Sequence, residues 1–458
     1  MARVLRWVVN QSTHPLYRLH HVDDATLFRH TVDATGRCSR DALDRLPLWR
    51  SDPLLLHSVP LPPGTPTRPR NEDLSPQEDR AFGAVMGMAV GDAIGAPLEF
   101  LSYRPTGCPP SLGIDGTPLP GADVFNKFSL RQGQWTDDTA LGLCLLDSLI
   151  SSNGAPLSPA DLLLRFCAWW WSGYNNAFGE LSSQGGIIHG ATWPSEPSRV
   201  LAAFDAVRED RLSIGLGKNM SDALDAFRRS GATVAATGNS AGNGSIIRLA
   251  PVCLLGGGDA RAAVAAARTQ SLATHAGPEA TGCSEALAWA LCAAVRAPPS
   301  ATPAVRKELV LHAFATYPGP VVPSVRTLLR SEAEAGGSDP ERDWRWRAAD
   351  WRYAPGRAAA SPGYVGAYCM DALAMALHCV HSTDSFAAAV VCAANRRSDA
   401  DSVAAITGTL AGAIYGLRDI PAPWVAAVER WDGGGGILRR ARVLFHTPLC
   451  STEPARPP

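Results

Sequence analysis

The sequence GAVMGMAVGDAIG, residues 83–95, decides the fold, because its glycines recur every four positions. They are Gly83, Gly87, Gly91 and Gly95. Residues four apart lie on one face of an α-helix, so these glycines would form a single line. A glycine inside a helix lowers helix stability by up to about 1 kcal/mol. Close packing of another backbone along the line would offset this cost, so we predict a tightly packed helix here.

A helix start stands directly before these glycines. Ser75-Pro76-Gln77-Glu78 supplies an N-cap serine, a proline at the first helical position and the glutamate of a capping box. From here to about residue 430, apolar residues recur at three- and four-residue spacing. The clearest helical segments are 141–152, 161–171, 260–275, 284–297, 368–380 and 401–416. Few segments have the pattern of a strand, so the predicted fold class is all-α, a compact multi-helix bundle with long functional loops.

The composition is that of a globular protein with nearly balanced charge. The chain has 458 residues, enough for two or three domains, and 46% of them are hydrophobic. Lys and Arg number 42 against 43 Asp and Glu, a formal net charge of -1. Without an overall basic charge, nucleic acid is not expected to be the main partner. No uninterrupted apolar stretch is long enough to span a bilayer, so no membrane partner is expected.

The cysteines indicate a reducing compartment. There are 11, an odd number, and none forms a Cys-x-x-Cys pair. Several lie inside apolar helical segments, which favours reduced, buried thiols over disulfides or zinc ligands. The first residues, MARVLRWVVNQSTH, lack the apolar region of a secretory signal because Asn10 interrupts the apolar run. We therefore predict a cytoplasmic protein.

A proline-rich stretch divides the chain. Residues 1–57 mix short apolar runs with His, Arg and Asp, and form a predicted N-terminal extension of unknown role. Residues 58–74 are rich in proline, which favours an extended linker. The main domain is predicted to span 75–446, with a polar, Trp- and Arg-rich insert at 331–362. Residues 447–458 are predicted to be a frayed tail.

Two acidic clusters each stand just before an apolar helix: Thr136-Asp137-Asp138-Thr139 and Asp399-Ala400-Asp401-Ser402. Either cluster alone reads as a helix N-cap, where Asp, Ser and Thr are favoured. Paired carboxylates exceed what a cap requires, however, and a cation would relieve their repulsion. Because neither cluster contains His or Cys, an all-oxygen ligand set favours a hard ion such as Mg²⁺, Mn²⁺ or Ca²⁺. Two clusters could hold two ions.

A third motif, Gly242-Asn243-Gly244-Ser245, precedes the apolar stretch IIRLAPV. Glycine-rich backbone before a helix can expose N–H groups to phosphate oxygens. The same letters are also common in ordinary turns. Beside a cation site, the motif suggests a substrate that carries phosphate.

Six segments together resemble the ADP-ribosylglycohydrolase family in order and spacing. They are GAVMGMAVGDAIGAPLEF (83–100), QWTDDTALGLCLLDSL (134–149), GNGSIIRLAPV (242–252), THAGPEA (274–280), GYVGAYCMDALAMAL (363–377) and SDADSVAAITGTLAGAIYG (398–416). The resemblance covers roughly residues 76–430 and not residues 1–74. It implies an all-α fold with a binuclear Mg²⁺ centre in a central cleft, Mn²⁺ being the alternative ion. It also implies cleavage of the glycosidic bond at the C1″ carbon of ADP-ribose.

The resemblance also implies roles for individual residues. The metal ligands would be Thr136, Asp137, Asp138, Asp399, Asp401 and Ser402. The candidate catalytic carboxylates are Asp399, Asp401 and Glu99, the last of which closes the first motif. The substrate contacts would be Asn243, Gly244 and Ser245 along the diphosphate, His275 beside the ribose or a phosphate, and Tyr364 stacked on adenine.

Other residues are given structural roles. Asp92 and Arg248 are predicted to bridge or cap within helices. Trp344, Trp346 and Trp351 are predicted to pack the insert onto the body, the less favoured alternative being a rim that contacts a modified target. The family often has Gly-Gly where this chain has Arg396-Arg397. Glycine there lets the backbone turn without a Cβ, so the arginines could lower activity or reshape the pocket rim.

The chemistry follows from the substrate. Breaking a glycosidic bond to ribose develops positive charge on the ring, so the site must hold a water and place negative charge nearby. Metal ions lower the pKa of bound water and orient hydroxyls, and a carboxylate takes the proton. We expect Mg²⁺-dependent hydrolysis of ADP-ribosyl-arginine on a protein. The alternative is an immunity or blocking protein that binds a cognate ADP-ribosyltransferase through residues 1–57, with or without hydrolase activity.

Overall fold

The computed structural model describes residues 69, 71–104, 113, 127–128, 130–172, 174–177, 213–236, 241–334, 342–352, 364–432 and 435–450. The predicted N-terminal extension, 1–57, lies outside the described residues. The described part contains no strand, and its β-pairing is limited to isolated bridge residues, among them the pairs Glu99–Ser398, Gly242–Tyr368 and Ala333–Asp343. The predicted all-α fold class is confirmed.

The helices follow the apolar spacing of the sequence closely. The first half holds η3 (Asn71–Asp73), α6 (Pro76–Gly95), η4 (Ala96–Leu98), α7 (Asp137–Ser152), α8 (Pro159–Ser172), α11 (Lys218–Ser230), η5 (Asn243–Ser245) and η6 (Ala250–Gly257). The second half holds α12 (Ala260–Thr274), α13 (Pro278–Val295), α14 (Pro303–Ala315), α15 (Pro323–Arg330), α17 (Cys369–His381), α18 (Phe386–Ala394), α19 (Ala400–Tyr415), η8 (Leu417–Asp419), α20 (Ala422–Glu429) and α21 (Gly436–His446).

Helix α6 begins at the predicted capping box. The Ser75 hydroxyl accepts a hydrogen bond from the Glu78 N–H at 3.2 Å, and the Glu78 carboxylate accepts one from the Ser75 N–H at 2.9 Å. The helix then runs through the core with most of its residues buried. Its length and mean hydropathy would also suit a membrane span, but 89% of that window is buried inside the protein. Its apolar surface therefore contacts other helices.

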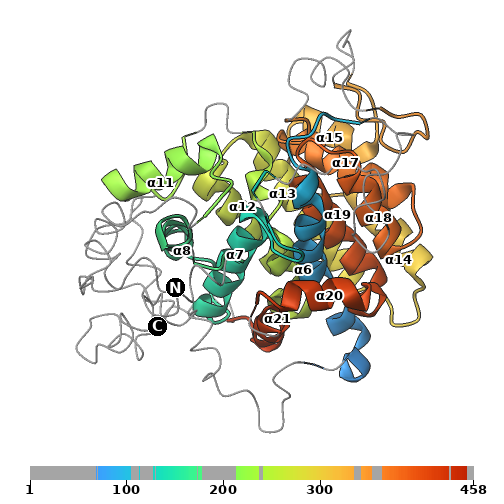
Figure 1. Ribbon diagram of the computed structural model, residues 1–458, viewed down its shortest axis with the longest axis horizontal. Coiled ribbons are helices and arrows are strands. Elements are labelled where there is room, and N and C mark those ends of the chain that lie inside the picture. The colour runs from blue at the N-terminus through green and yellow to red at the C-terminus, as the bar shows by residue number, and fades with distance from the viewer. Residues whose placement is uncertain are drawn as a thin grey trace, which may run out of the picture.

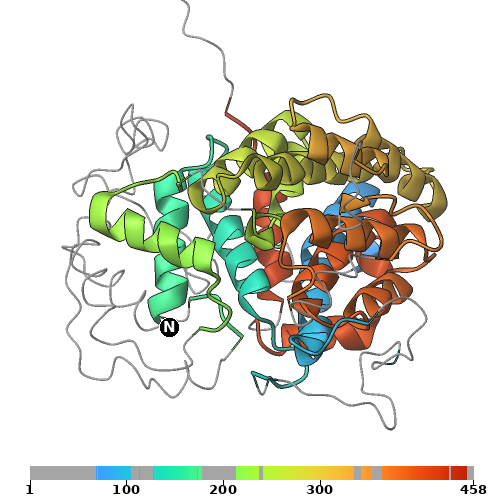
Figure 2. The ribbon, with the colours of Figure 1, turned by 90° about the horizontal axis from the view of Figure 1, so that it is seen from above.

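The glycine line of α6 packs against α19, as the spacing predicts. A Cβ on Gly83 would meet the backbone of Gly412, and one on Gly91 or Gly95 would meet the backbone of α19 at Ala404 or Ala400. The two helices therefore lie in direct backbone contact along their length. In Figure 1 they form the centre of the molecule, with α7, α8 and α11 on one side and α17, α18 and α14 on the other. Figure 2 shows the same arrangement from above.

The described parts of the predicted insert, 331–334 and 342–352, pack onto the body. Trp344 and Trp346 are fully buried, and Trp351 is nearly so. The Trp346 indole donates to the Leu328 carbonyl at 2.8 Å, and His378 Nδ1 lies 2.7 Å from the Trp346 carbonyl. The preferred structural interpretation of these tryptophans is confirmed. None of the three lines the pocket described below.

Residues just outside both ends of the predicted main domain also pack against it. Leu74 is buried, and its carbonyl accepts from the Arg418 guanidinium at 2.8 Å. At the other end, the Cys450 N–H donates to the Gly154 carbonyl at 2.9 Å. The nine cysteines within the described residues are free thiols, and seven of them are buried, as predicted.

Candidate metal centre

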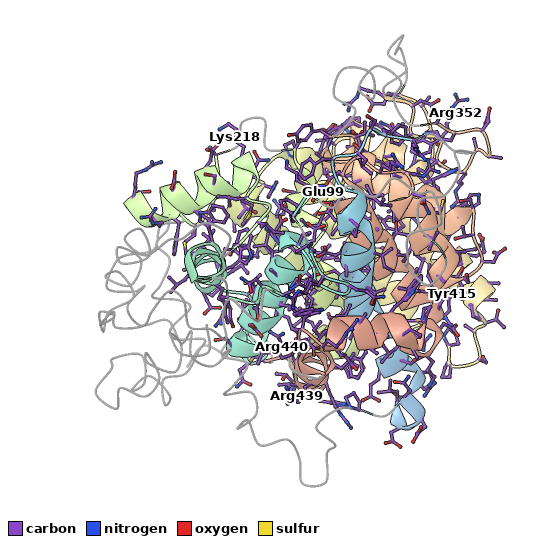
Figure 3. The ribbon with its side chains drawn as sticks, viewed as in Figure 1. Glu99, Lys218, Arg352, Tyr415, Arg439 and Arg440 are labelled. Atoms are coloured by element: carbon purple, nitrogen blue, oxygen red, sulfur yellow. The ribbon has the colours of Figure 1, made fainter. Side chains whose placement is uncertain are left out.

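The acidic residues of the two clusters converge at one end of the α6–α19 pair. Carboxylate oxygens of Asp137, Asp138 and Asp401 lie within 4.8 Å of one another, and so do those of Glu99, Asp399 and Asp401. Asp401 belongs to both groups, so the groups adjoin. Figure 3 shows Glu99 at the top end of α6, far from Arg439 and Arg440 of α21. The three carboxyl-bearing segments, 99, 137–138 and 399–401, are distant in sequence and meet only through tertiary contacts.

The carboxylates fit a cation. Glu99 Oε2, Asp138 Oδ2 and Asp401 Oδ1 are buried and have no hydrogen-bond partner. Burial, followed by repulsion from Asp401, raises the pKa of Glu99, Asp137 and Asp138 well above their ordinary values. Buried carboxylates with unpaired oxygens are costly unless they are protonated or bind a cation. An oxygen-only set of this kind suits a hard divalent ion.

Helix α7 presents the first cluster. Thr136 is the N-cap residue, yet its side chain makes no capping bond to its own helix. Its hydroxyl instead lies 2.9 Å from Asp92 Oδ1 and 3.2 Å from Asp401 Oδ2. Asp92, on α6, also accepts from the N–H and the hydroxyl of Thr139, at 2.9 and 2.7 Å. The prediction that Asp92 has a capping or bridging role is confirmed, but Asp92 caps the neighbouring helix α7 and not its own helix, α6.

The second cluster follows a strained turn. Arg397 and Ser398 have φ angles of 64° and 63°, in the left-handed region that glycine adopts most easily. The Phe100 N–H donates to the Ser398 carbonyl at 2.8 Å, and the Ser398 N–H donates to the Leu101 carbonyl at 2.8 Å. Phe100 itself has a φ of 65°. The two strained segments hold one another, and they place Glu99 beside Asp399.

Arg396 and Arg397 are not on the pocket rim. Both side chains are buried, and neither lines the pocket. The Arg396 guanidinium lies 3.5 Å from the Tyr103 hydroxyl, behind the turn. The arginines therefore do not form the pocket rim, as one part of the expectation had it, whereas the other part, that they lower activity, stays a prediction.

A cavity of about 510 Å³ opens over the acidic centre. The predicted residues among its lining are Glu99, Asp137, Asp138, Asn243, Gly244, His275, Tyr364, Asp399, Asp401 and Ser402. Asn243 Nδ2 donates to Asp399 Oδ2 at 2.7 Å and to the Gly366 carbonyl at 3.1 Å. Tyr364 is 64% exposed at the mouth, with its ring edge-on to Phe100 at 6.0 Å between centroids. The cavity thus joins the cation site to an aromatic mouth.

Two predicted residues do not reach the cavity wall. Ser245 is fully buried, and its hydroxyl accepts from the Ser284 hydroxyl at 3.1 Å. Thr136 is also absent from the lining, because its hydroxyl faces Asp92 and Asp401 behind the surface. The Gly242–Ser245 motif forms the 3-10 helix η5, followed by further 3-10 turns and no α-helix. The Asn243 N–H donates to the Ala367 carbonyl at 2.9 Å and is therefore not exposed for phosphate.

His275 lies under the glycines of this motif. It is almost fully buried, and burial, with repulsion from Arg248, lowers the pKa of its imidazole to about 3. The Thr274 hydroxyl accepts from the Arg248 guanidinium at 2.6 Å and lies 2.8 Å from His275 Nδ1. If that hydroxyl gives its one hydrogen to Nδ1, the imidazole carries its own hydrogen on Nε2, the atom nearer Gly244 than Nδ1. A neutral imidazole can then donate toward the cavity.

One wall of the cavity, formed by residues 215–220, was not predicted from the sequence. Gly215, Leu216, Gly217, Lys218, Asn219 and Met220 all line the cavity. Gly215 has a φ of 84°, and a Cβ there would collide with the Asp137 carboxylate. Figure 3 shows Lys218 at the start of α11, on the same side of the molecule as Glu99. Phe100 and Lys127, also missed, meet at the mouth, where the ammonium lies 3.6 Å from the ring centroid.

The fold and the site define an all-α protein in which a cluster of buried carboxylates, suited to bind a cation, lies at the base of a cavity. The chain belongs to the ADP-ribosylglycohydrolase family, whose family model matches residues 73–449. It is therefore a hydrolase of ADP-ribosyl glycosidic bonds.

Individual proteins show the same likeness. ADP-ribosylarginine hydrolase Tri1 of Pseudomonas putida is 32% identical over 379 residues, covering 81% of this chain and 80% of that protein. The protein of the same name from Serratia proteamaculans is 31% identical over 362 residues, covering 78% and 76%. A solved structure described as an ADP-ribosylglycohydrolase-related protein complex superposes with a TM-score of 0.55 at 25% identity, covering 81% of this chain and 100% of that chain.

Proposed function

We propose that this hydrolase removes ADP-ribose from arginine side chains of modified proteins, and that Mg²⁺ bound by the two acidic clusters is required. The observation that carries the proposal is the convergence of Glu99, Asp137, Asp138, Asp399 and Asp401 on one cavity. The arginine linkage is supported by the two similar proteins that are named ADP-ribosylarginine hydrolases.

The predicted ligands suit two adjacent ions. Asp137, Asp138 and Asp401 would hold one, and Glu99, Asp399 and Asp401 the other, with Thr136 and Ser402 as predicted hydroxyl ligands. When bound, Mg²⁺ would supply an activated water and orient the ribose hydroxyls. Mn²⁺ would satisfy the same oxygen ligands.

Individual residues of the chain would carry out the other steps: proton transfer, charge stabilisation and substrate binding. Asp399 is held by the Asn243 amide and is a candidate to take the proton from the water. Carboxylate oxygens of Asp401 and Glu99 lie within 4.8 Å of each other, so either residue can hold that proton afterwards. Negative charge on these carboxylates would stabilise the positive charge that develops on the ribose ring. Neutral His275 would donate to an oxygen of the ribose or phosphate, and Tyr364 would stack on the adenine.

The test is hydrolysis of ADP-ribosyl-arginine by the full-length protein with added Mg²⁺, followed by chromatographic detection of free ADP-ribose. Release that depends on Mg²⁺ is expected for the wild type and should be abolished in Asp401→Ala. Asp384→Ala is the matched control, because the Asp384 carboxylate is 96% exposed and is not part of the cavity lining. Release from ADP-ribosyl-serine but not from ADP-ribosyl-arginine would reject the arginine assignment.

The blocking role concerns residues 1–57, which lie outside the described part of the chain. A cognate transferase as partner therefore stays a prediction. It can be tested by pull-down of a candidate ADP-ribosyltransferase with the Asp401→Ala protein, with and without residues 1–57.

A further inference from the structure

Helix α7 lacks the usual local cap at the end that carries the acidic cluster. Threonine and serine are favoured at the N-cap because the side chain can accept a hydrogen bond from the backbone N–H two or three residues on. Thr136 makes no such bond, and its hydroxyl faces Asp401 and Asp92 instead. The N–H of Thr139, three residues after the N-cap, would be left without an acceptor if no other element supplied one.

Asp92 supplies that acceptor from α6. Its Oδ2 accepts from the Thr139 N–H at 2.9 Å and from the Thr139 hydroxyl at 2.7 Å. Its Oδ1 accepts from the Thr136 N–H and hydroxyl, both at 2.9 Å. The side chain is fully buried. One carboxylate therefore binds four donors on both sides of Asp137 and Asp138, and fixes the turn from which these two residues project.

Asp92 also ties this turn to α19. It stands between Gly91 and Gly95, whose Cα atoms face the α19 backbone at Ala404 and Ala400. The same stretch of α6 thus contacts α19 beside Asp401 and holds α7 beside Asp137. The arrangement has an electrostatic cost, because Asp92 adds another buried acid near Asp401, and burial together with that neighbour raises its pKa to about 7. A residue that served packing alone would not need a carboxylate here.

We propose that Asp92 is a positioning residue, which caps α7 from α6 and thereby holds Asp137 and Asp138 in the geometry that binds the cation. The inference rests on the proposed metal centre, since it concerns how that centre is assembled. Asp92 does not line the cavity, and it belongs to neither of the two groups of clustered carboxylates. Its effect on the cation would therefore pass through the turn at 136–139.

The test is calorimetric titration of the full-length protein with Mn²⁺ alone, without substrate. Asp92→Asn keeps the shape of the side chain, but its amide nitrogen cannot accept from the Thr139 or Thr136 donors. Loss of such a supporting contact typically weakens metal affinity 10- to 100-fold, so Asp92→Asn should raise the Kd for Mn²⁺ by at least about tenfold. The steady-state activity should recover in part at high metal concentration.

A second pair of variants tests the same contact without touching the carboxylate. Thr139→Val removes only the hydroxyl donor, whereas Thr139→Ser retains it. We expect weaker Mn²⁺ binding in Thr139→Val and wild-type binding in Thr139→Ser. Leu149→Ala, in the buried part of α7 away from the cavity, is the control for general destabilisation. It should lower the unfolding temperature and leave the Kd for Mn²⁺ unchanged.

The outcomes separate this inference from the proposed function. Wild-type protein that binds no divalent ion would overturn the metal centre and the inference together. Wild-type binding that is unchanged in Asp92→Asn and in Thr139→Val would overturn the inference alone. If Asp92→Asn does not fold, the Thr139 pair decides. Equal weakening by Leu149→Ala and Thr139→Val would also reject a specific positioning role.

Discussion

A Cβ on Gly87 would meet the carbonyl oxygen of Gly408, and a Cβ on Gly408 would meet the carbonyl oxygen of Gly87. Both collisions are with backbone, so neither can be relieved by turning a side chain. The contact lies midway along the α6–α19 pair, and the acidic centre lies at one end of that pair. Any separation of the two helices would therefore move Asp401 away from Asp92 and Glu99.

Gly87→Ala should strongly destabilise the protein. Overpacking of a filled core costs about 1–3 kcal/mol and occasionally more, and we expect the upper end because the obstacle is backbone. Gly436→Ala is the matched control, because the atoms nearest to a new Cβ there are side-chain atoms 3.6 Å or more away. Urea unfolding of both variants measures the difference. Equal stabilities would show that the two helices can separate without cost.

Divalent cations should stabilise the protein more at pH 8 than at pH 5. Burial raises the pKa of Asp399 to about 6 and that of Asp401 to about 7. Because the pKa of each group is higher in the folded than in the unfolded protein, both groups make their full contribution to the free energy of unfolding below about pH 4. That contribution is lost as the pH rises through 6 and 7. Mg²⁺ replaces the lost protons, so the rise in unfolding temperature on adding Mg²⁺ should grow with pH. EDTA should reverse it, and an equal rise at both pH values would contradict the cluster as the binding site.

Gly244→Ala should disturb His275 before it disturbs any ligand. A Cβ on Gly244 would lie 2.6 Å from His275 Cε1. The variant should therefore lose stability and bind ADP-ribose more weakly, as measured by thermal shift and calorimetry. Adding His275→Ala removes the collision and should restore part of the stability. The single variant His275→Ala is the reference for ADP-ribose affinity. If the double variant binds ADP-ribose as tightly as His275→Ala, the glycine acts only through the histidine; if it binds more weakly, the glycine backbone itself contacts the ligand.

His275 should make folding sensitive to acid. Its folded pKa of about 3 lies below the ordinary value of 6.5, so the unfolded chain binds the extra proton between these values. Stability from this group is then full above pH 6.5 and falls as the pH decreases. From pH 7 to pH 5 the wild type should lose about 2 kcal/mol more than His275→Gln. Denaturant unfolding of both proteins at the two pH values measures this, and parallel losses would show that His275 is protonated in the folded protein.

Tyr364→Ala should weaken ligand binding without affecting stability. The side chain is 64% exposed, so its removal leaves no buried cavity. Stacking of a base on an aromatic ring contributes about 1–3 kcal/mol, and we expect a loss of ADP-ribose affinity in that range. Tyr364→Trp is the control and should retain the affinity. Normal affinity in Tyr364→Ala would place the adenine elsewhere in the cavity.

The elements that depend on local pattern could be predicted from the sequence. The capping box at Ser75 and the glycine spacing of α6 are local signals, and both appear as expected. The segment 260–275 was expected to be a helix, and α12 spans Ala260–Thr274. The acidic residues could be placed together because paired carboxylates at two helix starts have no simple structural use.

The parts that depend on tertiary contacts could not be predicted. Ser245 faces Ser284 because α13 packs behind η5, and no local pattern signals this. Residues 215–220 line the cavity without an acidic or phosphate-binding motif; only Gly215, which turns the backbone against Asp137, leaves a trace in the sequence. The left-handed turn at Arg397 and Ser398 has no glycine in this chain to mark it, and only the Gly-Gly that the family often has at 396–397 indicates it.

The α6–α19 contact also determines when the acidic centre can form during synthesis. Helix α6 ends at Gly95 and α19 begins at Ala400, so about 300 residues of chain separate the two surfaces. During synthesis, α6 leaves the ribosome before α19 has been made. Its glycine face can pack against α19 only after nearly the whole chain has been synthesised. Such a non-local contact is slow to form, and an exposed apolar helix is prone to aggregate. A chain that stops before residue 400 would therefore lack Asp401, which belongs to both groups of carboxylates, and would leave the glycine face of α6 without its partner helix.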